Sequence, residues 1–225
     1  MADRVELDEY FFAQEVTSEQ MDDLWRHGWR HFGMFFFRYA TLAKSNGSYH
    51  VRPLRLKLTN FSLSTSQKRV IKKNQDLRLE IRDARIDEAK VALFDRHKTR
   101  FADNVPESIY DFFTPYPALI PCPAKEICLW QNEQLMAVSF LDIGAHATSS
   151  VYSIYEPTET KRSLGIYLIL LSIAYSRELG MTYYYHGYAY QEPSHYDYKK
   201  RFSGLEQFDW QEWKQAQEQN REAQA

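Results

Sequence analysis

The chain has 225 residues, enough to bury a hydrophobic core without disulfides, and its two cysteines, Cys122 and Cys128, lack the neighbouring histidines or cysteines of a zinc site. The acidic start is not what we expect of a signal peptide, and the longest apolar run, around residues 166–173, is too short to cross a membrane. The net charge of −2 is unevenly distributed, which matters more for partners than the sum. We therefore expect a cytoplasmic protein with no membrane partner.

The first elements are predicted to be a helix, an aromatic strand and a hairpin. Ser18 is a candidate N-cap for a helix over residues 19–31, which Gly33 would end. Met34–Tyr39 (MFFFRY) is rich in aromatic residues, as strands are. The Asn-Gly pair within Lys44–Ser48 is typical of a hairpin turn.

Alternation in Tyr49–Leu58 predicts a strand with one apolar face. Its core-facing residues are predicted to be Leu54, Leu56 and Leu58. Arg55 and Lys57 should then face outward. Pro53 lacks a backbone N–H, which indicates an edge strand or a bulge.

A run of basic residues without any acid extends over Tyr49–Gln75. Within it, we predict a short helix that starts at Ser64 or Ser66 and stops at Asn74. Four of its residues put like charges on adjacent turns: Lys68, Arg69, Lys72 and Lys73. Such a face is either simply solvated or a binding surface for nucleic-acid phosphates.

The middle of the chain is predicted to contain a strand, two helices and a linker. Leu77–Arg82 alternates as a strand does, residues 86–102 read as a mixed-charge helix, and Pro106–Phe113 opens a further helix with proline. Thr114–Pro123 (TPYPALIPCP) is the clearest linker. The chain is accordingly divided into an N-terminal half (1–113), a linker (114–123), a second half (124–205) and a polar tail (206–225).

The second half is predicted to be a meander followed by a helix and a strand. Three antiparallel strands are expected at residues 126–131, 134–143 and 148–155. Leu164–Leu179 is a long helix closed by Gly180, followed by a tyrosine-rich strand, Met181–Tyr190, and a short helix, Ser194–Phe202. This is the order of the back half of the GNAT acyltransferase fold, so we predict an α+β fold with a GNAT-like core and an N-terminal α/β half packed on it. The tail from Gln211 is expected to be a frayed helix or disordered.

The turn Lys161–Gly165 before the long helix is a candidate anion site, because helix N-termini present N–H groups and a favourable dipole. GNAT enzymes that use CoA carry Arg/Gln-x-x-Gly-x-Gly/Ala here, and Arg162 and Gly165 fit. Tyr167 stands where the second small residue belongs, and we expect its ring to obstruct a pyrophosphate. The structural alternative is a helix N-cap at Ser163.

Several stretches resemble the aminoacyl-tRNA–protein transferases, the arginyl- and leucyl-transferases of the N-degron pathway. They are LWRHGWRHFG from Leu24, RPLRLKLTNFSLSTSQKRVIKKNQDL from Arg52, LFDRHKTRF from Leu93, and SSVYSIYEPTETKRSLGIYLILLSIAYSRELGMTYYYHGYAY from Ser149 followed by YKKRF. They occur in the family's order, so the resemblance covers nearly the whole chain.

Two departures from the family pattern bear on the chemistry. The family's N-terminal cysteines, associated with metal or iron–sulfur binding, are absent from residues 11–20 and 39–50, so we expect no metal and no other cofactor. The family usually has Gly-Tyr-x-x followed by Cys-x-x-Met-x-Tyr-Lys, whereas this chain has Gly187–Tyr190 and then Ser194–Lys199 (SHYDYK), which puts acceptor preference or activity in question.

The resemblance implies that an amino acid, Arg or Leu, passes from aminoacyl-tRNA to the α-amino group of proteins that begin with Asp or Glu. The ester is already activated, and an α-amino group titrates at about pH 8. The protein must therefore supply positioning, a proton acceptor and stabilisation of the oxyanion.

Catalytic candidates follow from this reaction. Asp142, at a strand end, could hold or deprotonate the amine, or be only a turn residue. Tyr185, His186 and Tyr188 could relay a proton or stack the terminal adenosine, although alternation must point about half of them into the core. A further set could line the same mouth or a solvated helix face: His195, Tyr198 and Lys199.

Binding candidates are basic. The residues assigned to the donor tRNA are Lys161, Arg162, Ser163 and Gly165 of the turn, with Lys68, Arg69, Lys72 and Lys73. Arg52 and Arg55 could pair with an acidic acceptor side chain. Two other functions stay open. Tyr167 argues against a CoA-dependent small-molecule N-acyltransferase, and the retained basic residues argue against an inactive family member that acts as a binding module.

Overall fold

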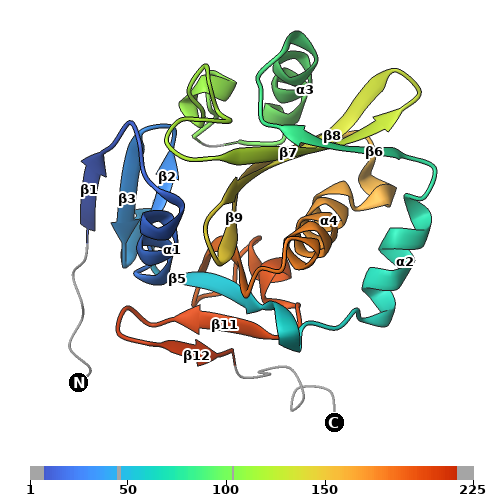
Figure 1. Cartoon of the computed structure of the whole chain (residues 1–225). Helices are drawn as coiled ribbons and strands as arrows, with labels where there is room; N and C mark the ends of the chain where they lie inside the picture. Colours follow the sequence, from blue (N-terminus) through green and yellow to red (C-terminus); the bar gives the residue numbers. More distant parts are fainter. Residues whose placement is uncertain (1–7, 45–46, 103, 217–225) are drawn as a thin grey trace.

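The computed structural model describes residues 8–44, 47–102 and 104–216, and its strands form two sheets (Figure 1). The smaller sheet has the order β1–β3–β2. The larger sheet runs β12–β11–β5–β10–β9–β8–β7–β6, and β4 pairs with one end of β5. β9 and β10 are parallel, and the other described neighbours are antiparallel.

The strands are β1 (Asp8–Phe12), β2 (Arg30–Phe32), β3 (Phe35–Tyr39), β4 (Thr41–Lys44), β5 (Gly47–Lys57), β6 (Arg78–Asp83), β7 (Ala124–Gln131), β8 (Gln134–Ile143), β9 (Ala147–Tyr155), β10 (Tyr183–Tyr190), β11 (Leu205–Phe208) and β12 (Trp213–Gln215). The helices are α1 (Ser18–Arg26), α2 (Thr65–Lys73), α3 (Glu88–Lys98) and α4 (Leu164–Glu178). Short 3-10 turns are η1 (Leu58–Asn60), η2 (Ile109–Asp111), η3 (Thr160–Arg162) and η4 (Asp197–Lys200).

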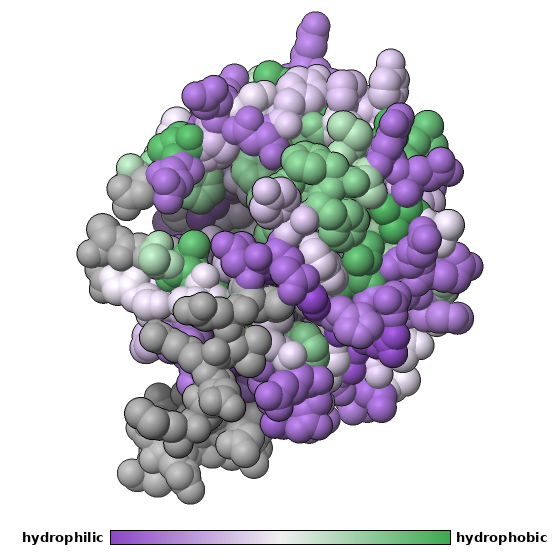
Figure 2. All heavy atoms as spheres, turned by 90° about the vertical axis from the view of Figure 1, so that its left-hand side faces the viewer, coloured by the Kyte–Doolittle hydropathy of each residue, from purple (hydrophilic) through white to green (hydrophobic). Residues whose placement is uncertain are grey.

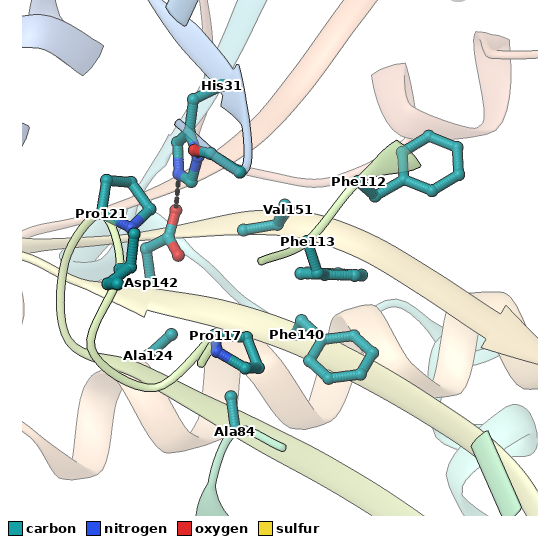
Figure 3. A pocket seen from close by; sticks show the side chains of 12 residues that line it. His31, Ala84, Phe112, Phe113, Pro117, Pro121, Ala124, Phe140, Asp142 and Val151 are labelled. Carbon is teal, nitrogen blue, oxygen red and sulfur yellow. Dashed lines mark hydrogen bonds and ion pairs between the residues drawn. The ribbon is translucent and has the colours of Figure 1, made fainter. Parts of the chain in front are cut away.

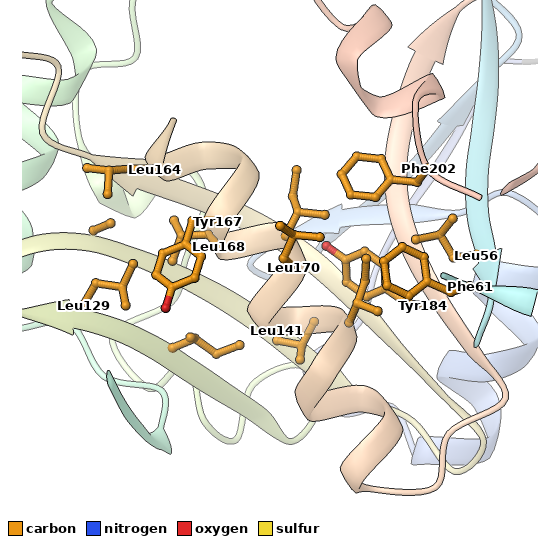
Figure 4. Packing of buried hydrophobic residues seen from close by; sticks show 14 of the residues in the cluster. Leu56, Phe61, Leu129, Leu141, Leu164, Tyr167, Leu168, Leu170, Tyr184 and Phe202 are labelled. Carbon is orange, nitrogen blue, oxygen red and sulfur yellow. The ribbon is translucent and has the colours of Figure 1, made fainter. Parts of the chain in front are cut away.

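The predicted meander, helix and strand are confirmed as β7, β8, β9, α4 and β10. Both faces of this part of the sheet are covered, because α3 and α4 lie on opposite sides of β7 and β8 (Figure 1). Alternate residues of β7 point to opposite faces of the sheet. Ile127 and Leu129 belong to the core on the α4 side, and Cys128 belongs to the core on the α3 side. Figure 4 shows the α4 side of this core, where Leu168 and Leu170 meet the sheet.

The first helix is shorter than predicted and has a different cap. Thr17, not Ser18, is the N-cap, and it forms a capping box with Gln20. The helix ends at Arg26 because Gly28 adopts a φ of +82°, in the left-handed region that favours glycine. The chain then turns into β2, so the second half of the expected helix is a strand.

The strand with Pro53 lies inside the sheet rather than at its edge. β5 is flanked by β10 on one side and by β4 and β11 on the other, and Pro53 lies opposite Tyr188 close to a bulge in β10. Strand β5 comes before the linker and β10 after it, so the large sheet contains strands from both sequence halves. The predicted hairpin is confirmed by the pairing of β4 with β5, although turn residues 45–46 lie outside the described part of the chain.

Three other expectations were wrong. The predicted helices at residues 106–113 and 194–202 are only the turns η2 and η4. The tail from Gln211, predicted to be a frayed helix or disordered, contains strand β12 (Trp213–Gln215), which pairs with β11. Residues 217–225 lie outside the described range.

The small N-terminal sheet has an apolar outer face. Exposed apolar side chains gather on β1, on the start of β3 and in the turn just before it: Tyr10, Phe12, Phe35 and Met34. Figure 2 looks onto this side of the molecule and shows apolar residues grouped among hydrophilic ones. The opposite face of this sheet packs through Phe36 against Trp25 and Tyr185, which joins it to the large sheet.

Candidate functional site

The parallel strands β9 and β10 pair over only three residues before they separate. The last pair is Tyr185 with Ser149, and the next residue of β10, His186, lies at a bulge. Beyond this point the edges of the two strands accept hydrogen bonds from two cationic side chains of other elements, Arg30 and Lys199. Polar groups therefore lie close together where β9 and β10 separate, in the middle of the large sheet.

Arg30 comes from β2 and reaches β9. Its guanidinium donates hydrogen bonds to the hydroxyl of Ser149 and the carbonyl of Ser150. Burial lowers the pKa of Arg30 from its ordinary value. The side chain thus takes the place of a strand neighbour for β9 and brings a positive charge into the gap.

Lys199 comes from η4 and reaches β10. Its Nζ donates to the carbonyl of Tyr188 at 3.1 Å. Burial, and then the charge of Arg30, lower the pKa of Lys199 to about 7. The lysine therefore titrates near neutral pH.

Gly187 keeps the space between these two cations open. It has a φ of +86°, and a Cβ at this position would lie 3.3 Å from Lys199 Nζ and 3.9 Å from Arg30 Nη2. A side chain here would occupy the point on which the two cations converge. The glycine is thus required both by the backbone and by the neighbours.

His186 is buried beside them without hydrogen-bond partners. Its side chain is 3% exposed, packs edge-on against Phe202, and neither ring nitrogen has a partner among the described residues. Burial, then the charges of Lys199 and Arg30, hold the pKa of His186 well below its ordinary value. The imidazole is therefore neutral at pH 7, and its lone pair is available to a ligand.

The other two catalytic candidates lie in separate surroundings. Asp142 accepts a hydrogen bond from His31 Nε2 at 2.7 Å beside a small apolar cavity (Figure 3). Tyr185 packs against Trp25 and receives a 3.4 Å hydrogen bond from Arg55. Among the described residues, no hydrogen bond joins Asp142, Tyr185 and His186 to one another, so the sequence-predicted trio is not assembled.

The surroundings of Asp142 contain the best candidate metal ligands in the described chain. The ligand atoms of His31, Cys122 and Asp142 lie within 4.8 Å of one another, and all three side chains are buried. However, the second ring nitrogen of His31 contacts the Gly33 carbonyl at 2.9 Å, and burial raises the pKa of the Cys122 thiol, which disfavours the thiolate that binds metals. The trio fits a hydrogen-bonded core cluster better than a metal centre.

The turn before α4 is tied to the end of α2. Arg162 donates to both carboxylate oxygens of Asp76 at 2.8 Å, Lys73 Nζ donates to the Lys161 carbonyl at 2.8 Å, and Asn74 donates to the Arg162 carbonyl at 2.9 Å. Lys161 itself is exposed. Arg162, predicted from the sequence to bind the tRNA phosphates, is thus already paired with the carboxylate of Asp76.

Ser163 and Gly165 in this turn are constrained by backbone conformation and by close neighbours. Ser163 adopts a left-handed φ of 54° and makes no side-chain capping hydrogen bond, so it is not the predicted side-chain N-cap. Gly165 lies against the ring of Tyr155, where a Cβ on residue 165 would come within 3.1 Å of a ring carbon. Tyr167 was expected to obstruct this turn, but its ring is buried in the core beneath α4 (Figure 4).

The basic face of α2 is confirmed as solvent-exposed. Its exposed residues are Lys68, Arg69, Lys72 and Lys73. Gln67 on the same helix contacts the Arg201 carbonyl at 3.4 Å, immediately after η4. The basic face therefore lies between the turn before α4 and the element that carries Lys199.

The predicted acceptor-binding arginines are already engaged. Arg55 was expected to face outward, but it is buried, stacks between Tyr183 and Trp213, and pairs with Glu206 at 2.7 Å. Arg52 donates to the side chain of Gln191. Tyr188 donates its hydroxyl to the Gly28 carbonyl at 2.6 Å and so joins β10 to the N-terminal half.

Of the sequence candidates, the structure brings together His186, the backbone of Tyr188, and Lys199. Arg30 was missed because the pattern placed it at the end of a helix. Its position inside LWRHGWRHFG, one of the stretches that resemble a known family, was the available signal. No helix of the described residues is long and apolar enough to cross a membrane.

The chain is similar in sequence to known proteins. The family described as "Arginine-tRNA-protein transferase, C terminus" matches residues 89–209. A protein named "Aspartate/glutamate leucyltransferase" from Helicobacter hepaticus is 29% identical over 205 residues, which cover 88% of this chain and 82% of that protein. Its namesake from Acinetobacter baumannii is 30% identical over 190 residues, 83% of this chain and 68% of that protein.

Among solved structures, FemX is similar with a TM-score of 0.50 at 10% sequence identity. The match covers 82% of this chain and 66% of the FemX chain. At this identity the likeness concerns the fold alone, and it supports the predicted α+β fold with a GNAT-like core.

Proposed function

Since the chain belongs to the aminoacyl-tRNA–protein transferase family, we propose that it transfers leucine from Leu-tRNA to proteins whose first residue is Asp or Glu. The chain is an aminoacyltransferase. The choice of leucine and of acidic acceptors is supported by the names of the relatives, and arginine is the alternative donor amino acid.

We propose that the reaction takes place where β9 and β10 separate. This is where two strand edges leave their mutual hydrogen bonds and where His186 keeps both ring nitrogens unpaired in a buried position. Buried polar atoms are nearly always paired, so two unpaired nitrogens at a strand separation support a site for a bound ligand or water there. We place the aminoacyl ester there.

The reaction is an aminolysis in which one bond forms and one breaks. The neutral α-amino nitrogen attacks the ester carbon, the bond between that carbon and the ribose oxygen breaks, and the tRNA leaves with a free hydroxyl. The amine loses a proton as the peptide bond forms. Neutral His186 can accept this proton and return it to the departing ribose oxygen, since the amine nitrogen becomes more acidic once it carries the new bond.

The basic face of α2 and the exposed Lys161 would meet the phosphates of the donor tRNA. Their positive charges lie on and beside α2, which contacts the turn before α4 through Lys73 and the residue after η4 through Gln67. Contacts to phosphate position a nucleic acid without reading its sequence. This arrangement suits an enzyme that takes the same 3′ end from tRNAs of different sequence.

A reducing compartment such as the cytoplasm suits this protein. Both Cys122 and Cys128 are buried free thiols. A CoA-dependent acyltransferase is the less favoured function, because Arg162 of the turn that would hold CoA is bound by Asp76.

Transfer can be tested with the purified chain, labelled Leu-tRNA or Arg-tRNA, and peptides that begin with Asp, Glu or Ala. We expect label from Leu-tRNA on the Asp and Glu peptides. His186→Phe should lower kcat by about 10²- to 10⁴-fold without loss of tRNA binding. His27→Gln, on the exposed end of α1, is the matched control. No transfer from either tRNA, together with saturable binding of acetyl-CoA, would contradict the proposal.

A further inference from the structure

Two cationic side chains from different elements converge on one point of β10. Arg30 Nη2 and Lys199 Nζ both lie within 4 Å of the position that a Cβ of Gly187 would take. One comes from β2 in the N-terminal half and the other from η4 near the C-terminal end. Each is half-buried and held by a backbone carbonyl, so neither is a freely moving surface charge.

The two cations have no carboxylate partner among the residues that the structure describes. The ion pairs among these residues involve other cations, and Asp142, whose charge acts on Arg30, is hydrogen-bonded to His31. Two like charges in a half-buried site repel one another, and the lowered pKa values of both groups reflect burial first and, for Lys199, the charge of Arg30. An anion that enters between them would relieve this repulsion.

A carboxylate suits this site by size and by the number of its oxygens. Its two oxygens can accept hydrogen bonds from two donors at once, and the guanidinium of Arg30 still has hydrogens beyond those that Ser149 and Ser150 accept. Lys199 Nζ gives one hydrogen to Tyr188, which leaves others for a ligand. The open space above Gly187 is where the ligand would lie.

The position points to the acceptor protein rather than to the donor phosphates. The pair lies at the strand separation, where the acceptor amine must meet the ester, and the side chain of the first residue leaves from the carbon next to that amine. Arg52 and Arg55, the sequence-based candidates for this task, are held by Gln191 and Glu206. The phosphates have the exposed basic face of α2.

We propose that Arg30 and Lys199 together bind the side-chain carboxylate of the first residue of the acceptor, an inference that rests on the proposed function. They are then the residues that distinguish Asp and Glu from their amides.

The test compares acceptor peptides that differ only in this charge: Asp against Asn, and Glu against Gln, at the first position. Lys199→Met should lower kcat/KM for the Asp and Glu peptides by about 10- to 100-fold and leave the Asn and Gln peptides nearly unchanged. Lys199→Arg should restore part of the preference because it keeps the charge. Lys200→Met is the matched control, because Lys200 is next to Lys199 in the sequence and its ammonium pairs with Asp197 instead.

Each other outcome has a defined meaning. Equal losses for acidic and amide peptides, or unchanged preference, would overturn the inference. A loss of Leu-tRNA affinity in Lys199→Met, measured by filter binding, would also overturn it and assign the pair to phosphate. If the unaltered enzyme transfers no amino acid to any peptide, the proposed function itself fails, which this series detects before any variant is compared.

Discussion

The Nη1 and Nη2 nitrogens of Arg162 donate to the two carboxylate oxygens of Asp76, at 2.8 Å each. The arginine also contacts Glu159 at 3.1 Å. A fork that already holds a carboxylate has little left to offer a phosphate. The side chain is therefore a link between α2 and the turn before α4, rather than a free anion receptor.

We expect Arg162→Ala to lower the free energy of unfolding by about 1 kcal/mol, a modest value because the partner Asp76 is half exposed. The salt dependence of tRNA binding should hardly change. The matched variant is Lys72→Ala on the exposed face of α2, which should reduce the slope of log K against log salt by about 0.7 to 0.9. The opposite pattern, with a flatter slope only in Arg162→Ala, would return Arg162 to the tRNA site.

Sequence patterns predicted the helices and strands whose apolar residues follow a simple period. They failed where tertiary contacts determine whether an element forms or where it ends. Alternation and apolar length identified β7 to β10 and α4. The end of α1 depended on Gly28, whose hydrogen in place of a side chain lets Trp210 approach. Strand β11 has only four residues and forms because β5 offers a partner, which no local pattern records.

Stability should fall as the pH drops from 7 toward 4, in part because of His97. Burial lowers the pKa of His97 to about 4 from 6.5, and Arg100 donates toward its Nε2 nitrogen, which opposes protonation. The unfolded chain binds this proton below pH 6.5 and the folded chain does not until pH 4, so acid favours unfolding. The contribution between pH 7 and pH 5 is on the order of 2 kcal/mol.

Denaturant unfolding at pH 7 and pH 5 measures this effect. In His97→Gln the decrease between the two pH values should be smaller by about that amount, although the variant is less stable at pH 7. Equal decreases in both proteins would mean that His97 is protonated in the fold as readily as outside it.

Lys90 and Glu126 form a buried ion pair that fixes α3 to β7. Their charged atoms lie 3.1 Å apart, both side chains are fully buried, and Asp87 lies 2.7 Å from the same ammonium. Lys90→Met removes one of the two cations that contact the buried Glu126 and leaves Arg82 at 2.6 Å, so we expect a loss of about 1–3 kcal/mol in unfolding free energy. Lys98→Met, which breaks a surface pair with Asp95 on the same helix, should cost less than about 1 kcal/mol. Similar values for the two variants would contradict the assignment.

At the candidate site, sequence patterns identified several of the residues but not which side chains lie next to them in the fold. His186 and Lys199 were both among the candidates, and the resemblance in YKKRF drew attention to the lysine. Arg30 completes the group only because β2 packs beside β9, a contact between positions 119 residues apart. Arg55 was misassigned because alternation gives the face of a strand but not what covers it, and here Trp213 and Glu206 do.

Gly187→Ala tests whether the point between Arg30 and Lys199 must stay open. The new methyl group would lie 3.3 Å from Lys199 Nζ, and the left-handed backbone costs an L-residue roughly 1–2 kcal/mol. Gly180→Ala is a close control, since Gly180 has a φ of +73° but nothing within 4 Å of its Cβ position. Both variants should lose similar stability, whereas only Gly187→Ala should lose transfer to Asp and Glu peptides under conditions where it is folded. Equal activity in the two variants would show that the space above Gly187 is not used by a substrate.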